Sequence, residues 1–146
     1  MEAGFVLAER YELRDRIGEG ASSTVWDAID CNTNECVAVK IVSLDEAGWR
    51  AEVRDRFMQE ARLLALGRHA HLVQVRDLGE TDDGSLYLVL ERLRGETLAE
   101  RLARPPRPSW REAAGLAQQL ARGLSALHAQ GIIHRDLKPA NVIVGE

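Results

Sequence analysis

The chain has 146 residues, a formal net charge of -4 from 19 basic and 23 acidic side chains, and 45% hydrophobic residues. This length fits one domain, and the hydrophobic content is high enough to form a core, which excludes an intrinsically disordered chain. The mildly acidic balance disfavours a protein that binds nucleic acid by neutralising phosphates. No apolar run approaches the roughly 20 residues of a membrane span, and the first ten residues do not resemble a signal peptide. We therefore expect a cytoplasmic protein.

Lysine is rare in this chain. The basic residues comprise 17 arginines and two lysines, Lys40 and Lys138. Arginine carries a planar fork of donors, whereas lysine carries a compact, mobile point charge that suits a phosphate oxygen. The two lysines are therefore candidates for phosphate contacts.

Short strands separated by turns are predicted in the first part of the chain. Five stretches are rich in apolar and β-branched residues, at 10–17, 24–29, 37–42, 72–78 and 86–90. Turn residues separate them, including a glycine-rich segment at 18–23, an Asn-rich segment at 30–35 and Asp-Asp-Gly at 82–84. This pattern predicts an antiparallel sheet of about five strands.

Three helices are also predicted. Residues 50–66 place apolar side chains at helical spacing with charges between them. The segments 97–100 and 109–112 both match the capping box, in which a hydroxyl and a carboxylate cover backbone amides at a helix start. The helix that begins at the second of these carries a long apolar stripe and stops before Gly131.

The character of the sequence changes between Glu91 and Gly95, from strands to helices. We expect an α+β fold with two parts. Residues 1–92 form the sheet with one helix, and residues 93–146 form a mostly helical part that ends in a polar loop and the start of a strand.

A glycine-rich turn, Gly18-x-Gly20-x-x-Ser23-x-Val25, lies between two predicted strands. Alone it is weak evidence, because an ordinary hairpin turn explains it equally well. The residues after Ser23 are strand-like, whereas a dinucleotide-binding fold requires a helix there. A glycine-rich loop between antiparallel strands can instead place backbone N–H groups over a polyphosphate.

Lys40 follows the apolar run 37–39 in a predicted strand. Taken alone, such a lysine is a solvated residue on the face of a sheet. A charged group beside an apolar strand needs a partner, and Glu60 on the following predicted helix can supply one. Taken alone, Glu60 is a surface charge.

The strongest signal is the polar loop His134-Arg-Asp-Leu-Lys-Pro-Ala-Asn141, which follows two isoleucines. A structural loop does not need so many polar groups. Phosphoryl transfer accounts for them: Asp136 to orient an attacking hydroxyl and accept its proton, Asn141 to hold a magnesium ion, and Lys138 to steady the transferring phosphoryl group.

These motifs, in this order, resemble the eukaryotic-type (Hanks-type) serine/threonine protein kinases, and the bacterial members in particular. The resemblance covers the chain from Tyr11 to Val144. It implies a protein-kinase-like fold, with a kinase N-lobe at 1–92 and the start of the C-lobe, including the catalytic loop, at 93–146. It also implies ATP and Mg²⁺ as cofactors and the Ser and Thr hydroxyls of proteins as acceptors.

The resemblance assigns a role to each candidate residue. In the nucleotide site it implies that Gly18, Gly20 and Val25 cover ATP and that Ala38 and Leu90 contact the adenine. Lys40 would bind the α- and β-phosphates, with Glu60 as its partner. The backbone of Glu91 and Leu93 would hydrogen-bond the base. In the polar loop it implies Asp136 as catalytic base, Lys138 as phosphate contact and Asn141 as magnesium ligand. His134 and Arg135 would then be structural or regulatory.

The sequence departs from the family pattern at two places. Ser23 stands where the third glycine usually lies, and no Asp follows Asn141, so the family's Asp-Phe-Gly magnesium site and activation loop are not among the 146 residues. Without that carboxylate the phosphate charge is poorly neutralised. We therefore interpret the chain as the N-terminal part of a kinase domain and expect these residues alone to transfer no phosphate to proteins.

Two other functions fit parts of the pattern. A non-catalytic nucleotide-binding or scaffold module would have no need of a base such as Asp136. Small-molecule phosphotransferases of related fold usually lack the His-Arg-Asp form that precedes Lys138 here. An Asp-Phe-Gly soon after Glu146 in the coding sequence would favour the kinase over the scaffold.

Overall fold

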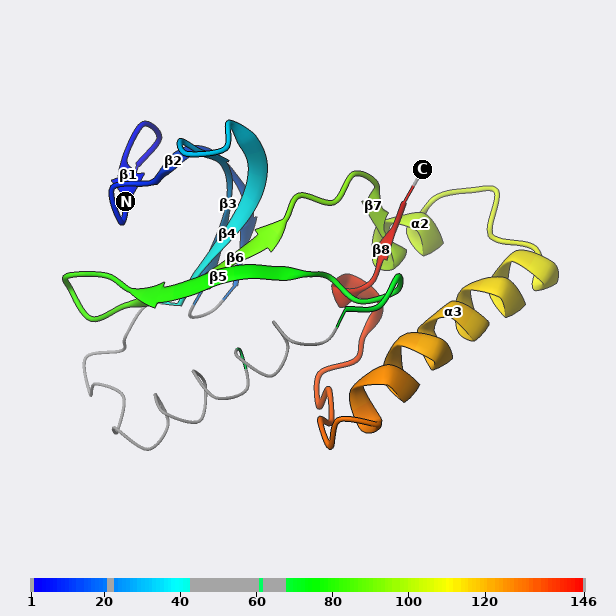
Figure 1. Ribbon diagram of the computed structural model, residues 1–146. Helices are drawn as coiled ribbons and strands as arrows, with labels where there is room; N and C mark the ends of the chain where they lie inside the picture. The colour runs from blue at the N-terminus through cyan, green and yellow to red at the C-terminus, as the bar shows by residue number, and fades with distance from the viewer. Residues whose placement is uncertain (1, 21–22, 43–60, 62–67, 146) are drawn as a thin grey trace. The chain divides into compact units, whose positions relative to one another are not determined.

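The computed structural model describes residues 2–20, 23–42, 61 and 68–145 (Figure 1). Most of the predicted helix 50–66, including Glu60, lies outside the described residues; Ala61 is helical and buried. The chain divides into two compact units, Met1–Leu66 with Gln74–Arg92, and Gly67–Val73 with Leu93–Glu146. The second unit therefore includes a short segment that precedes the last two strands of the first.

The first unit contains a six-stranded antiparallel sheet in the order β1-β2-β3-β4-β6-β5. Its strands are β1 (Val6–Leu7), β2 (Tyr11–Glu19), β3 (Ser23–Asp30), β4 (Glu35–Val42), β5 (Val75–Glu80) and β6 (Leu86–Glu91). The five predicted strands are confirmed, and the two-residue β1 is added by pairing of Leu7 with Tyr11. β5 begins three residues later than predicted because Leu72 lies in a turn, where its N–H donates to the carbonyl of His69 at 3.0 Å.

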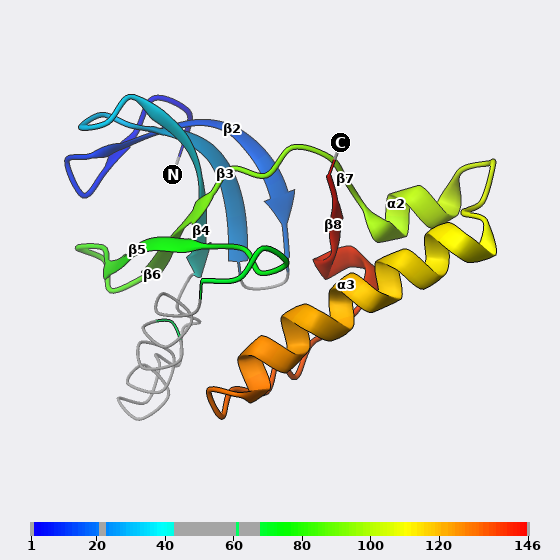
Figure 2. The same ribbon diagram turned by 45° about the vertical axis from the view of Figure 1, so that its right-hand side comes forward.

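One face of this sheet forms the core. Side chains alternate between the two faces of a strand, and in β4 Val37, Val39 and Ile41 are buried on the same face. The sheet is curled (Figure 2). The core cluster consists of Leu7, Tyr11, Leu13, Trp26, Ala28, Val37, Val39, Ile41, Tyr87 and Val89. By the same alternation Ala38 and Lys40 lie on the opposite face of β4, away from this cluster.

A charged network ties the start of β2 and the end of β3 to β5. Arg10 donates to Asp30 from Nε at 2.9 Å and from Nη2 at 2.7 Å, and its Nη1 lies 3.4 Å from Asp77. The hydroxyl of Tyr11 donates to Asp77 at 2.6 Å. The hydrogen bond from Arg10 lowers the pKa of Asp30 to about 2, while burial and the bond to Asp77 raise the pKa of Tyr11.

The helices of the second unit begin where the capping boxes predict. In α2 (Leu98–Ala103) Thr97 and Glu100 cap each other, and in α3 (Trp110–His128) Ser109 and Glu112 do the same. α3 ends three residues before Gly131, which adopts a positive φ of 74°. Among the described residues no helix combines the length and the apolar character needed to cross a membrane.

The remaining elements of the second unit are a short helical turn and a ribbon. They comprise the 3₁₀ turn η1 (Pro139–Asn141) and the strands β7 (Glu96–Thr97) and β8 (Ile143–Val144), which pair with each other. The segment before β5 packs on α3: a Cβ added to Gly123 would lie 2.9 Å from the carbonyl oxygen of His71. This close approach explains why 67–73 belongs to the second unit.

Candidate active site

The predicted glycine-rich turn joins β2 to β3. Gly18 pairs with Val25 across the two strands, and the N–H of Gly20 donates to the carbonyl of Ser23 at 2.7 Å. A Cβ added to Gly18 would lie 3.4 Å from the Cβ of Val25. The tip of the turn, residues 21–22, lies outside the described residues. Gly18 and Gly20 themselves therefore place no side chain over Val25.

Strand register brings the other predicted nucleotide-site residues of this unit onto the same face of the sheet. Lys40 lies opposite Val25 of β3 and Leu88 of β6, and Ala38 lies opposite Leu90. These residues are buried or half-buried. The result is an apolar surface with one ammonium group at its side. Glu60, the predicted partner of that ammonium, lies outside the described residues.

The end of β6 is held by hydrogen bonds to Gln74. The N–H of Glu91 donates to the carbonyl of Gln74 at 3.0 Å, and the N–H of Gln74 donates to Oε1 of Glu91 at 2.8 Å. Because its N–H is occupied, Glu91 can offer a ligand its backbone carbonyl. Leu93, the other residue predicted at the base, belongs to the second unit.

In the polar loop, the side chains of the predicted base, phosphate contact and magnesium ligand meet. Nζ of Lys138 lies 2.9 Å from Oδ2 of Asp136. Nδ2 of Asn141 donates to the same carboxylate oxygen at 2.9 Å and to the backbone carbonyl of Asp136 at 2.8 Å. These contacts, that of Lys138 first, lower the pKa of Asp136. The carboxylate is therefore ionised at neutral pH and fixed in orientation.

Local backbone geometry explains how the loop makes this cluster. Arg135 has a positive φ of 59°, which turns the chain so that the N–H of Asp136 donates to the carbonyl of His134 at 2.8 Å. Pro139, whose ring fixes φ, then starts η1, and the N–H of Asn141 returns to the carbonyl of Lys138 at 2.9 Å. The 3₁₀ turn thus brings Asn141 back to Asp136.

The ribbon β7–β8 holds the far end of the loop. Thr97 pairs with Ile143, and the N–H of Leu98 donates to the carbonyl of Val142 at 2.8 Å. Gly95, just before the ribbon, has a φ of 137°, and a Cβ there would lie 2.2 Å from the carbonyl oxygen of Val144. The sequence pattern did not single out this glycine as a site-supporting residue, because its requirement comes from a segment almost fifty residues away.

The loop offers one side-chain oxygen that could serve as a ligand for a magnesium ion. Nδ2 of Asn141 is engaged with Asp136, which leaves Oδ1 as the type of oxygen ligand that Mg²⁺ prefers. Within the described part of the chain, no three or more His, Cys, Asp or Glu side chains are grouped so that they could hold a metal ion.

Comparison with known proteins identifies the family. The family model for the protein kinase domain matches residues 11–146. Serine/threonine-protein kinase PknA of Mycobacterium tuberculosis (strain H37Ra) is 37% identical over 145 residues, which are 97% of this chain and 33% of the relative. The probable serine/threonine-protein kinase PknB of Corynebacterium glutamicum is 40% identical over 143 residues, 96% of this chain and 22% of the relative.

Solved structures agree with this result. The kinase domain of M. tuberculosis PknI is similar with a TM-score of 0.86 and 27% identity, over 99% of this chain and 59% of that domain. The protein-kinase-like fold expected from the sequence is thereby confirmed. The chain spans a third or less of the length of the curated relatives named above. It belongs to the protein kinase family, and the relatives named above to which it is similar are bacterial serine/threonine kinases.

Proposed function

We propose that this chain is the nucleotide-binding and catalytic-loop part of a kinase that transfers the γ-phosphate of ATP to Ser or Thr hydroxyls of proteins. The observation that carries the proposal is the contact of both Lys138 and Asn141 with one carboxylate oxygen of Asp136. Phosphoryl transfer depends on positioning and charge stabilisation, and this cluster supplies an oriented base, a cation and an amide oxygen within six residues.

In the catalytic loop each residue has a distinct role. Asp136 orients the acceptor hydroxyl and takes its proton as the phosphoryl group transfers, and its lowered pKa keeps it ionised beforehand. Lys138 steadies the γ-phosphate, and Asn141 holds a magnesium ion through Oδ1. When bound, that ion neutralises charge on the phosphates.

The nucleotide site is proposed on the first unit together with Leu93. The backbone of Gly18 and Gly20 covers the phosphates, and Lys40 binds the α- and β-phosphates with Glu60 as its partner. Val25, Ala38 and Leu90 contact the adenine, whose polar edge is bound by the backbone of Glu91 and Leu93. The support is the shared face of Val25, Ala38, Lys40 and Leu90 in the sheet. We also propose that this part of the chain works in the cytoplasm, where ATP and protein substrates are available.

Calorimetric titration of the 146-residue chain with ATP and Mg²⁺ tests the nucleotide site. We expect binding that weakens at least about tenfold in Lys40→Met, because the proposed charge-assisted contact to phosphate is lost. Undiminished binding in that variant would contradict the role of Lys40.

Transfer of labelled phosphate from ATP to a protein substrate by the full gene product tests the activity. We expect transfer that depends on Asp136. Binding of ATP by the gene product without any transfer would overturn the proposal in favour of a nucleotide-binding module.

A further inference from the structure

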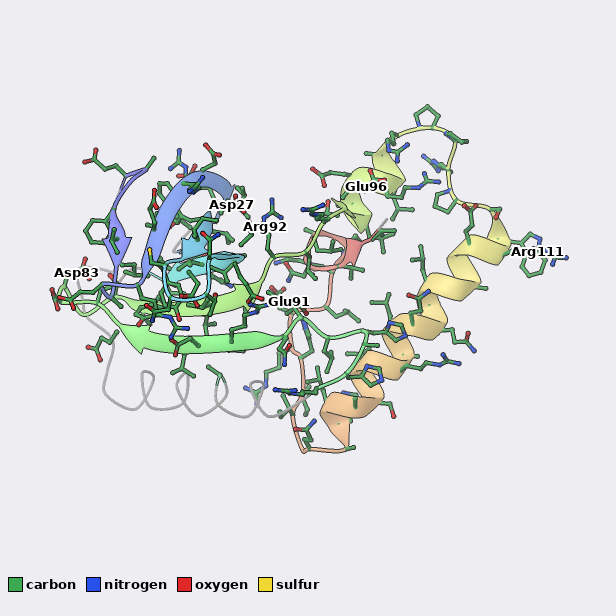
Figure 3. The ribbon with its side chains drawn as sticks, turned by 45° about the horizontal axis from the view of Figure 1, so that its top comes forward. Asp27, Asp83, Glu91, Arg92, Glu96 and Arg111 are labelled. Atoms are coloured by element: carbon green, nitrogen blue, oxygen red, sulfur yellow. The ribbon has the colours of Figure 1, made fainter. Side chains whose placement is uncertain are left out.

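One ion pair on the proposed nucleotide face has no part in the roles assigned above. Nε of Arg92 donates to Oδ1 of Asp27 at 2.5 Å, and Figure 3 shows the two side chains directed toward each other. Asp27 lies within β3, and Arg92 directly follows β6. Because β4 lies between β3 and β6 in the sheet, this pair links two strands that do not pair with each other.

The register shows where the link crosses β4. Asp27 lies opposite Ala38, and Glu91 lies opposite Val37, so Arg92 follows at the level of Cys36. Ala38 and Cys36 share one face of β4 by the alternation of side chains. Both side chains are short, which leaves room for the longer side chains of the pair to meet across them.

This position places the link at one end of the proposed adenine surface. Ala38 of that surface lies opposite Asp27 on one side and Leu90 on the other, so the three residues form one row across β3, β4 and β6. The adjoining residue, Glu91, is already tied to Gln74 on the β5 side. The end of β6 is therefore held from both sides, by Gln74 through Glu91 and by Asp27 through Arg92.

We propose that Asp27 and Arg92 are positioning residues for adenine binding. Their ion pair fixes the spacing between β3 and the end of β6, so that the carbonyl of Glu91 and the methyl group of Ala38 are already in place when the base arrives. Fixing these groups in advance lowers the ordering cost of binding. This inference rests on the proposed function, since it takes the same face as the nucleotide site.

Comparing the affinities for adenosine and for ATP distinguishes an effect on adenine binding from an effect on phosphate binding. A positioning effect weakens adenosine and ATP equally, because both carry the same base. If the pair instead served to neutralise the carboxylate of Asp27, only ATP, which carries the polyphosphate charge, would lose affinity when Arg92 is replaced.

The test is calorimetric titration of the 146-residue chain with adenosine and, separately, with ATP and Mg²⁺. The variants are Asp27→Asn, Arg92→Gln and the double variant. We expect each single variant to bind both ligands about 2- to 5-fold more weakly, the range for a partly exposed ion pair. The double variant should be no weaker than either single variant, because all three lose the same link.

A matched control is available on the same sheet. Arg76 and Glu35 form another partly exposed ion pair, between β5 and the first residue of β4. Arg76→Gln removes a comparable surface link and should leave both affinities unchanged. Thermal unfolding of all variants should give similar midpoints, which separates positioning from loss of fold.

The outcomes distinguish this inference from the proposed function. A wild-type chain that binds neither adenosine nor ATP overturns the proposed nucleotide site itself. Wild-type binding that both single variants retain in full overturns only the positioning role. A loss confined to ATP, or a double variant whose loss is the product of the two single losses, also overturns it.

Discussion

The two units hold their candidate site residues by different means. In the first unit Val25, Ala38 and Lys40 share a face because β3 and β4 pair in one register. In the second unit Asp136 and Asn141 meet because of a single 3₁₀ turn within the loop. A strand-borne site thus depends on pairing across the whole sheet, whereas the loop-borne cluster needs a few local backbone bonds and one supporting ribbon.

Exposure of the charged groups differs in the same way. The side chains of Asp136 and Lys138 are 65% and 53% exposed, whereas that of Asp30, in the network of the sheet, is 6% exposed. Exposed ion pairs contribute little to stability, while a buried carboxylate depends strongly on its partner. Substitutions in the loop should therefore change chemistry, and substitutions in the sheet network should change stability.

The strongest challenge to this distinction is Asp136→Asn. We expect phosphate transfer by the full gene product to fall at least about 100-fold, because the base is lost. The free energy of unfolding of the 146-residue chain should change by less than about 0.5 kcal/mol, as for other exposed substitutions. Radiolabel transfer and denaturant titration measure the two effects.

Asp82→Asn, in the turn between β5 and β6, is the matched control and should affect neither quantity. A large loss of stability in Asp136→Asn would show that the loop cluster is structural rather than chemical.

Gly95→Ala tests how far the loop depends on its ribbon. The added Cβ would lie 2.2 Å from the carbonyl of Val144 at a positive φ, so we expect a loss of about 2–4 kcal/mol in the stability of the second unit. Hydrogen exchange of the amides of Leu98 and Asn141 should accelerate, because both lie beside the ribbon.

Gly115→Ala provides the comparison, since nothing lies within 4 Å of a Cβ at that position of α3. It should stabilise the helix by up to about 1 kcal/mol. Equal effects of the two substitutions would contradict the strain assigned to Gly95.

Asp30→Asn tests the buried network of the sheet. Loss of the charge-assisted bonds to Arg10 should cost about 2 kcal/mol at neutral pH. Because the pKa of Asp30 is lowered to about 2 in the folded state, its stabilising contribution is present above about pH 4 and is lost as the pH falls toward 2. The variant should therefore show a smaller acid-induced loss of stability in denaturant titrations. Glu2→Gln is a suitable exposed control.

The smallest of the expected effects is the change that Lys138→Met makes in the titration of one group. Lys138 is the main cause of the lowered pKa of Asp136, so its removal should raise that pKa toward the ordinary value for Asp. In the variant Asp136 then takes up its proton at a higher pH than in the wild type. NMR titration of the carboxyl carbon measures this directly. Lys40→Met, in the other unit, should leave it unchanged, and an unshifted titration in Lys138→Met would refute the contact.

The sequence by itself determined the features that depend on neighbours along the chain. The hydroxyl and carboxylate of each capping box lie three residues apart, so both helix starts could be predicted and are confirmed. The polar loop could be predicted as a cluster because its residues lie within one short segment. The strands β2 to β6 also followed from local apolar patterns.

Only the tertiary structure decided the features that join distant segments. β1 exists because Leu7 pairs with Tyr11, and 67–73 joins the second unit because His71 packs on Gly123. The requirement for glycine at position 95 and the pairing of Asp27 with Arg92 are likewise set by partners 49 and 65 residues away. No local pattern encodes such contacts, because they arise from the register and packing of elements that the chain brings together only on folding.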